Sequence, residues 1–99
     1  MKTLFVLLIA SAAAFAQSDA KAIYDSKCAA CHAADGSGNT AKGRKLKMKG
    51  VKETAAKVKA EEMMKIVTDG KGADMDAFGK EFSKDQIKAL VEYYRGLAK

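Results

Sequence analysis

Two cysteines and the chain's only histidine lie together in the run Cys28-Ala29-Ala30-Cys31-His32. Two thiols three positions apart at the end of a helix can each add to one of the two vinyl groups of a haem. A histidine directly after the second thiol then lies beneath the iron. The pattern therefore predicts one covalently attached haem c, held by Cys28 and Cys31, with His32 as an axial ligand of its iron.

Other uses of the cysteine pair are weaker interpretations. A thioredoxin-like dithiol has the same spacing, but it occurs in a fold of alternating strands and helices, and this sequence shows no strand pattern. A zinc site needs four good ligands, and two cysteines with one histidine leave the fourth position without a donor. A disulfide between Cys28 and Cys31 would close a very small loop and stabilise the fold little. Haem attachment is therefore the favoured interpretation.

The sixth iron ligand cannot be a second histidine of the chain, which leaves methionine, lysine, another weak donor, water or an open position. Beyond the initiator the methionines are Met48, Met63, Met64 and Met75. Met63 lies on the apolar face of a predicted helix, where core packing is the expected role. We expect Met75, in the glycine-containing run 70–78, to ligate the iron, with Met48 and Met64 as alternatives. Histidine–methionine ligation raises the reduction potential and fills every coordination position, which favours electron transfer over catalysis.

The first sixteen residues have the pattern of a secretory signal peptide: Lys2, an apolar run at 4–10, and small residues ending at Ala16. We expect cleavage near Ala16, with an uncleaved anchor or a slightly shifted cut as the alternatives. Cleavage leaves residues 17–99 as one small domain with 17 basic and 12 acidic side chains, a net charge of +5. No other segment is apolar enough for stable membrane insertion. The expected location is the periplasm.

The spacing of apolar residues predicts an all-α fold with three main helices and long loops. The first helix is expected at about 19–30 and the second around 61–69, ending at Gly70. The third begins at a capping box formed by Ser83 and Gln86. The connecting segments are predicted as a turn at 35–40, a loop with one short helix at 41–59, and an irregular loop at 71–80.

Further residues follow a known order along the chain. They are Tyr24 four residues before Cys28, the loop Asp35-Gly36-x-Gly38-Asn39, the helix end 68–72, Met75 with Phe78 three later, and a last helix with Leu90 and Tyr93. With the CxxCH motif, these residues resemble those of the small bacterial class I cytochromes c across essentially the whole mature chain. The resemblance implies a small cytochrome c fold around one covalently bound haem. It also implies that the first and last helices cross near the haem, with Ala20 and Tyr24 against Leu90 and Tyr93.

The chain departs from this family in having no proline. Asp76 stands where the family usually has a proline after the ligand methionine. A second family proline lies in the loop after the haem motif, where a backbone carbonyl accepts a hydrogen bond from the proximal histidine; here Ala41 or a neighbour must supply that carbonyl. Both losses are expected to loosen the loops that hold the haem.

Eight basic side chains crowd one stretch, opposed only by Glu53: Lys42, Arg44, Lys45, Lys47, Lys49, Lys52, Lys57 and Lys59. One interpretation is a solvated surface. The other is a basic ring around the exposed haem edge that steers the protein onto an acidic redox partner, with Arg44 or Lys45 pairing with a haem propionate. An export signal and few aromatic residues argue against nucleic acid as a partner. We expect a monomer.

These features together predict a periplasmic monohaem electron carrier, not an enzyme, that shuttles single electrons between redox protein partners. The alternative is a haem enzyme or sensor, acting on peroxide or a small gas at an open or labile sixth position. A thiol oxidoreductase is a more distant alternative.

Overall fold

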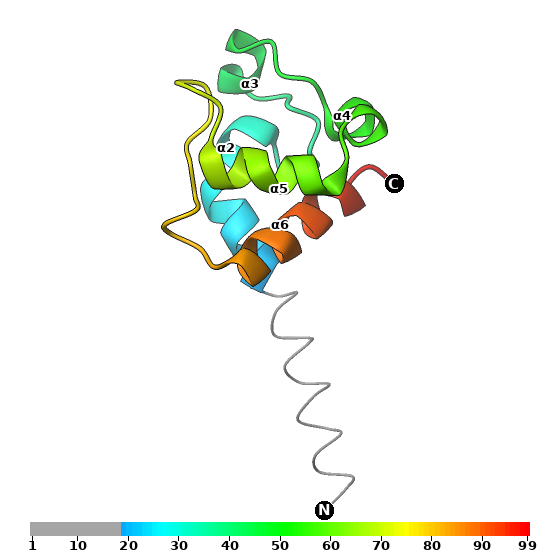
Figure 1. Ribbon diagram of the computed structural model, residues 1–99. Helices are drawn as coiled ribbons and strands as arrows, with labels where there is room; N and C mark the ends of the chain where they lie inside the picture. The colour runs from blue at the N-terminus through cyan, green and yellow to red at the C-terminus, as the bar shows by residue number, and fades with distance from the viewer. Residues whose placement is uncertain (1–18) are drawn as a thin grey trace, which may run out of the picture.

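The computed structural model describes residues 19–99, so the signal peptide predicted at 1–16 lies outside the described residues. A helix at 19–27 is followed by α2 (Ala29–His32), α3 (Ala41–Lys45), α4 (Val51–Lys57), α5 (Ala60–Asp69) and α6 (Lys84–Gly96) (Figure 1). Within this part of the chain no strand forms, and one isolated bridge joins Lys71 to Met75. The all-α prediction is confirmed. No helix among residues 19–99 is both long and apolar enough to cross a bilayer.

The helix at 19–27 packs against α6, as the resemblance implied. Ala20, Tyr24 and Leu90 are buried, and the ring centroids of Tyr24 and Tyr93 are 5.2 Å apart. Aromatic pairs at this separation add to the stabilisation that comes from burial alone. The predicted helix at 19–30 is, however, two pieces, because the regular helix stops at Cys28 and α2 begins after it.

Helices α5 and α6 form the other main packing pair, and their predicted ends are confirmed. Helix α6 starts at the predicted capping box, in which Ser83 Oγ accepts from the Gln86 N–H at 3.1 Å and Gln86 Oε1 accepts from the Ser83 N–H at 2.8 Å. Helix α5 stops before Gly70, whose φ of +78° suits glycine. Met63 of α5 is buried with three residues of α6, Ile87, Leu90 and Val91.

The segment 41–59 holds two short helices, whereas the sequence predicted a loop with one. Helices of five and seven residues are too short to be stable through local propensity, so other parts of the chain must support them. The Arg95 guanidinium of α6 provides such support, donating to the Val58 carbonyl at 2.6 Å and the Ala55 carbonyl at 3.5 Å. Ala55 lies in the last turn of α4 and Val58 is its C-cap residue, so the end of this helix is held by a residue about 40 positions away.

Candidate haem site

The CxxCH motif lies where the first helix gives way to the single turn of α2. The Cys28 carbonyl accepts from the Cys31 N–H at 3.2 Å and from the His32 N–H at 2.9 Å, which closes that turn. Residues three apart on a helical turn are neighbours, so the thiol-bearing residues are adjacent. Both cysteines are half-buried and not joined in a disulfide. This arrangement fits two thiols that bond to one planar group.

Burial raises the pKa of the Cys28 thiol to about 11, and the nearby Cys31 contributes in the same direction. A dithiol redox catalyst needs the reverse, a cysteine whose lowered pKa keeps it as a reactive thiolate. The environment of Cys28 therefore opposes the thiol oxidoreductase interpretation. A zinc site is also unsupported, since no group of three His, Cys, Asp or Glu side chains within residues 19–99 could hold a metal ion.

The His32 ring is half-buried, and burial lowers its pKa, which favours the neutral imidazole that binds metals. Its Nδ1 atom is fully buried and has no hydrogen-bond partner among the described residues. Nε2 is therefore the ring nitrogen that a metal ion could reach. The edge of the ring also meets Tyr94, with centroids 5.1 Å apart.

The prediction that Ala41 or a neighbour supplies a carbonyl acceptor for the proximal histidine is wrong. No carbonyl within residues 19–99 accepts a hydrogen bond from His32 Nδ1. The loop instead contacts the histidine through its backbone, where the Gly38 N–H donates to the His32 carbonyl at 2.8 Å. The chain beyond the motif thus folds back under His32 without bonding its ring.

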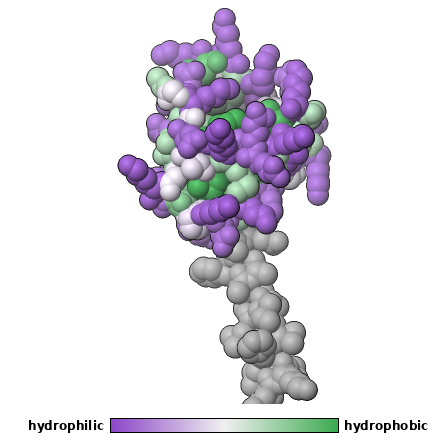
Figure 2. Space-filling view, viewed as in Figure 1, coloured by the Kyte–Doolittle hydropathy of each residue, from purple (hydrophilic) through white to green (hydrophobic). Residues whose placement is uncertain are grey.

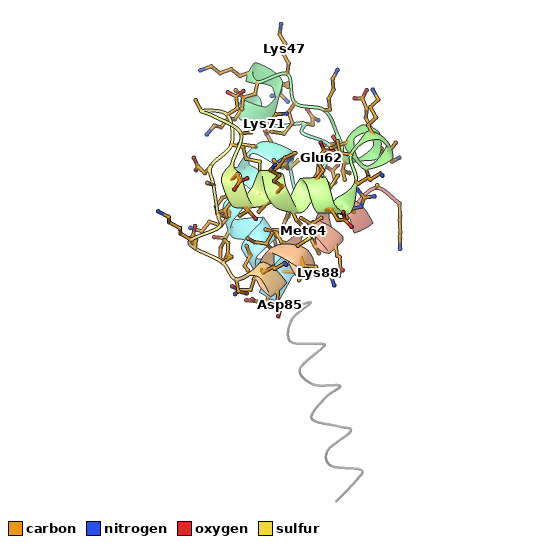
Figure 3. All side chains as sticks on the ribbon, viewed as in Figure 1. Lys47, Glu62, Met64, Lys71, Asp85 and Lys88 are labelled. Carbon is orange, nitrogen blue, oxygen red and sulfur yellow. The ribbon has the colours of Figure 1, made fainter. Side chains whose placement is uncertain are left out.

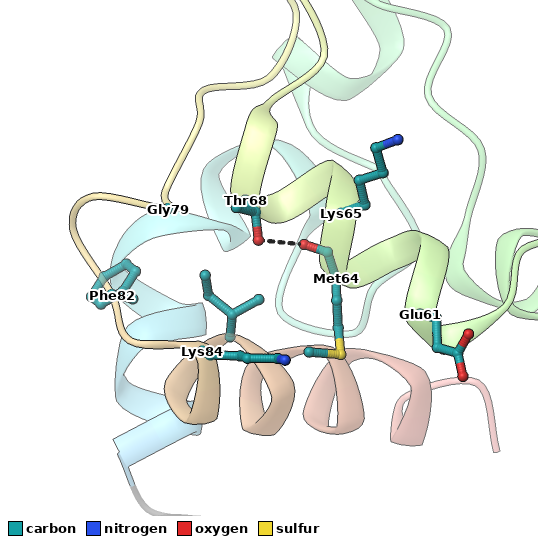
Figure 4. Close-up of a pocket in the computed structure, with 8 residues that line it drawn as sticks. Glu61, Met64, Lys65, Thr68, Gly79, Phe82 and Lys84 are labelled. Atoms are coloured by element: carbon teal, nitrogen blue, oxygen red, sulfur yellow. Dashed lines mark hydrogen bonds between the residues drawn. The ribbon is translucent and has the colours of Figure 1, made fainter.

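Three of the four candidate methionines contact parts of the chain other than the CxxCH motif. Met63 is buried, and its sulfur accepts from the Arg95 guanidinium at 3.5 Å. Met64 points from α5 toward α6, into a groove of about 520 Å³ that Phe82 also lines (Figure 4). Met48 lies beside Gly38, with its Cγ 3.4 Å from where a Cβ at that glycine would stand.

Met75 is half-buried in the irregular loop between α5 and α6, as predicted. Its carbonyl accepts from the Lys71 N–H at 2.9 Å, and the Phe78 N–H donates to the Val67 carbonyl of α5 at 2.9 Å. The end of the loop reaches the helix before the motif, where Lys27 Nζ lies 3.2 Å from Glu81 Oε1. The loop that carries Met75 is thus bonded to α5, and its far end at Glu81 forms an exposed ion pair with the helix that precedes Cys28.

Two grooves beside Phe82 are not lined by the candidate haem-binding residues. The larger one lies between α5 and α6, and a second one of about 250 Å³ lies beside it, with Phe82 lining both. None of Cys28, Cys31, His32 and Met75 lines either groove. The residues of the motif, rather than the size of a groove, locate the site.

A helical fold around one CxxCH motif is the arrangement of a c-type cytochrome, and a solved structure agrees. The chain is similar to the KustC0563 c-type cytochrome, with 28% sequence identity and a TM-score of 0.73, over 80% of this chain and 96% of that one. The protein is a small c-type cytochrome. Its sequence from residue 15 to residue 93 matches the family described as cytochrome c oxidase, cbb3-type, subunit III, and the chain belongs to that family. No curated protein matches it. Membership implies covalently bound haem with iron.

Proposed function

We propose that this protein is a periplasmic electron carrier with one haem per chain, attached to Cys28 and Cys31 and ligated by His32 and Met75. The observation that carries the proposal is the environment of the chain's only histidine. It follows two adjacent unpaired cysteines, and its Nδ1 is enclosed by protein. When bound, haem supplies a one-electron Fe(III)/Fe(II) couple, and the protein tunes it through axial ligands and burial.

The assignment of Met75 rests on the surroundings of the other methionines. Met63 is engaged by Arg95, Met64 lies in the groove between α5 and α6, and Met48 lies against the loop that folds under His32. Met75 lies on a different segment, the loop whose far end at Glu81 pairs with Lys27, next to Cys28 in sequence. A thioether from that segment completes the coordination and leaves no position for a substrate, which supports a carrier rather than an enzyme.

We infer that its partners are redox proteins with acidic docking surfaces. Residues 41–59 carry eight basic and one acidic side chain, whereas the other described residues carry nine basic and eleven acidic ones. All eight basic side chains are exposed. Figure 3 shows Lys47 extending into solvent beyond α3, and Figure 2 shows mostly hydrophilic side chains, with a few hydrophobic ones among them, at that end of the molecule. A surface of one sign accelerates encounter with a surface of the opposite sign.

The deciding experiment is the absorption spectrum of the exported protein, oxidised and reduced, together with its intact mass. We expect a mass of residues 17–99 plus a single haem, and the weak long-wavelength band of a sulfur-ligated ferric haem. Met75→Ala should abolish that band because the thioether is lost. Met64→Ala serves as the matched control and should keep it.

Other outcomes decide between the remaining functions. A haem spectrum without the sulfur band, with ready binding of carbon monoxide by the reduced protein, would favour an enzyme or sensor with an open sixth position. A protein exported without haem would contradict the proposal altogether.

A further inference from the structure

The plane of the His32 ring is not fixed by a hydrogen bond from the ring to another of the described residues, so other contacts must fix it. A metal-ligating histidine almost always donates its second ring N–H to a carbonyl, carboxylate or water, and that bond fixes the tautomer and the ring plane. Within residues 19–99, no carbonyl or carboxylate accepts a hydrogen bond from the buried His32 Nδ1. Apart from the edge contact with Tyr94, with ring centroids 5.1 Å apart, the orientation of the ring must therefore be set through the backbone to which it is attached.

Two hydroxyl groups hold that backbone, one on each side of His32. The Tyr24 hydroxyl donates to the Ala33 carbonyl at 2.6 Å, and the Thr40 hydroxyl donates to the Cys31 carbonyl at 2.8 Å. The two acceptors are the residues directly after and directly before the histidine. We call this pair of hydrogen bonds the hydroxyl clamp.

Both donors of the hydroxyl clamp are themselves fixed. Tyr24 is only 1% exposed and is the largest fully buried side chain among the described residues. The Thr40 hydroxyl caps α3, because its oxygen accepts from the buried Gly43 N–H at 2.9 Å. The clamp therefore connects His32 to the packed first helix on one side and to α3 on the other.

The backbone next to His32 also needs to be held. Ala33 has φ +70° and ψ 158°, a combination that is open to glycine and strained for a side chain. Such a conformation is unfavourable for any residue other than glycine and persists only where its surroundings impose it. A hydrogen bond on its carbonyl from an immobile tyrosine opposes relaxation of this peptide, and relaxation would turn the His32 ring.

We propose that Tyr24 and Thr40 are positioning residues for His32, and that they take over the orienting role usually played by a hydrogen bond to the ring. The inference rests on the proposed ligation of iron by His32. It adds two residues, in the first helix and at the start of α3, that act on the backbone on either side of His32 and so set the angle of its ring.

The test uses the exported, haem-containing protein with Tyr24→Phe and Thr40→Val, which remove each hydroxyl at nearly constant shape. Thr40→Ser restores the hydroxyl. Thr68→Val is the matched control, since the Thr68 hydroxyl also donates to a backbone carbonyl, that of Met64 in α5, at 2.7 Å. The readouts are the proton NMR signals of the His32 ring and haem methyl groups in the ferric protein, and the midpoint potential.

We expect Tyr24→Phe and Thr40→Val to shift the NMR signals and the potential, Thr40→Ser to return both toward wild type, and Thr68→Val to leave both unchanged. If the first two variants lower Tm but keep wild-type NMR signals and potential, the clamp is structural only and the inference is overturned. A wild-type protein whose NMR spectrum shows no iron-bound histidine would instead overturn the proposed ligation itself, which separates the two failures.

Discussion

Burial sets the protonation of the reactive side chains around the CxxCH motif. It raises the pKa of the Cys28 thiol and lowers that of the His32 imidazole, so both groups are neutral at physiological pH. Neutral imidazole is the form that ligates metals, and a protonated thiol resists disulfide exchange. The same burial thus favours the proposed haem-ligating role of His32 and disfavours dithiol catalysis.

Ala33 provides the sharpest prediction at the scale of a single residue. Ala33→Gly should stabilise the protein by about 1 kcal/mol. Glycine adopts the observed φ and ψ without strain, and this gain exceeds the extra conformational entropy that a glycine loses on folding. The free energy of unfolding by urea measures this. Ala34→Gly, next along the chain and not at positive φ, is the control and should be neutral or destabilising. Equal effects of the two changes would show that Ala33 is not strained.

At the scale of the elements, one glycine decides how closely α3 approaches the haem motif. Gly43 is buried in α3, and a Cβ there would collide with the Gly38 carbonyl and lie 2.8 Å from the Cys31 carbonyl. Both of these atoms belong to backbone, which cannot move aside as the end of a flexible side chain can. Contact between α3 and α2 therefore requires glycine at this position.

Two glycine-to-alanine substitutions should have opposite effects. Gly43→Ala should destabilise the haem-containing protein by about 1–3 kcal/mol through overpacking. Gly96→Ala, at the end of α6 with no atom within 4 Å of the new Cβ, should stabilise it by about 0.5 kcal/mol through helix propensity. Thermal unfolding of both variants checks the pair. A neutral Gly43→Ala would contradict the close packing of α3 on α2.

At the scale of the whole molecule, charge is distributed unevenly. Residues 41–59, which include α3 and α4, carry the excess of positive charge, while the remaining described residues are slightly acidic in sum. The molecule therefore has a pronounced electrical asymmetry, and its orientation near a charged surface should follow from it.

An electrode coated with carboxylate groups offers a defined acidic surface for testing this. Lys45→Glu with Lys47→Glu should slow electron exchange at that electrode more than Lys84→Glu with Lys88→Glu, although both double variants change the net charge equally. Voltammetry at rising salt measures the effect, and salt should reduce the difference between the variants because it screens exposed charges. Equal slowing by both double variants would mean that net charge, rather than the 41–59 surface, governs docking.

Local signals along the chain determined much of what this protein is. The CxxCH spacing, the cap at Ser83 and Gln86, and the end of α5 at Gly70 each depend on residues within one helical turn of one another, and the structure shows both helix ends as predicted. Membership of a c-type cytochrome family agrees with the motif. Neighbouring residues suffice for these inferences because turn, cap and thiol spacing are properties of a few consecutive residues.

The crossing of the first and last helices was implied by the family resemblance, but other contacts between distant residues were decided only by the tertiary structure. The second short helix in 41–59 depends on Arg95, and the closeness of α3 to the motif depends on the fit of Gly43. The lack of an acceptor for His32 Nδ1, and the hydroxyl clamp that flanks it, likewise follow from how the loop folds back. Sequence spacing carries no record of such pairings, because they arise when separate segments pack together and bury each other's polar groups.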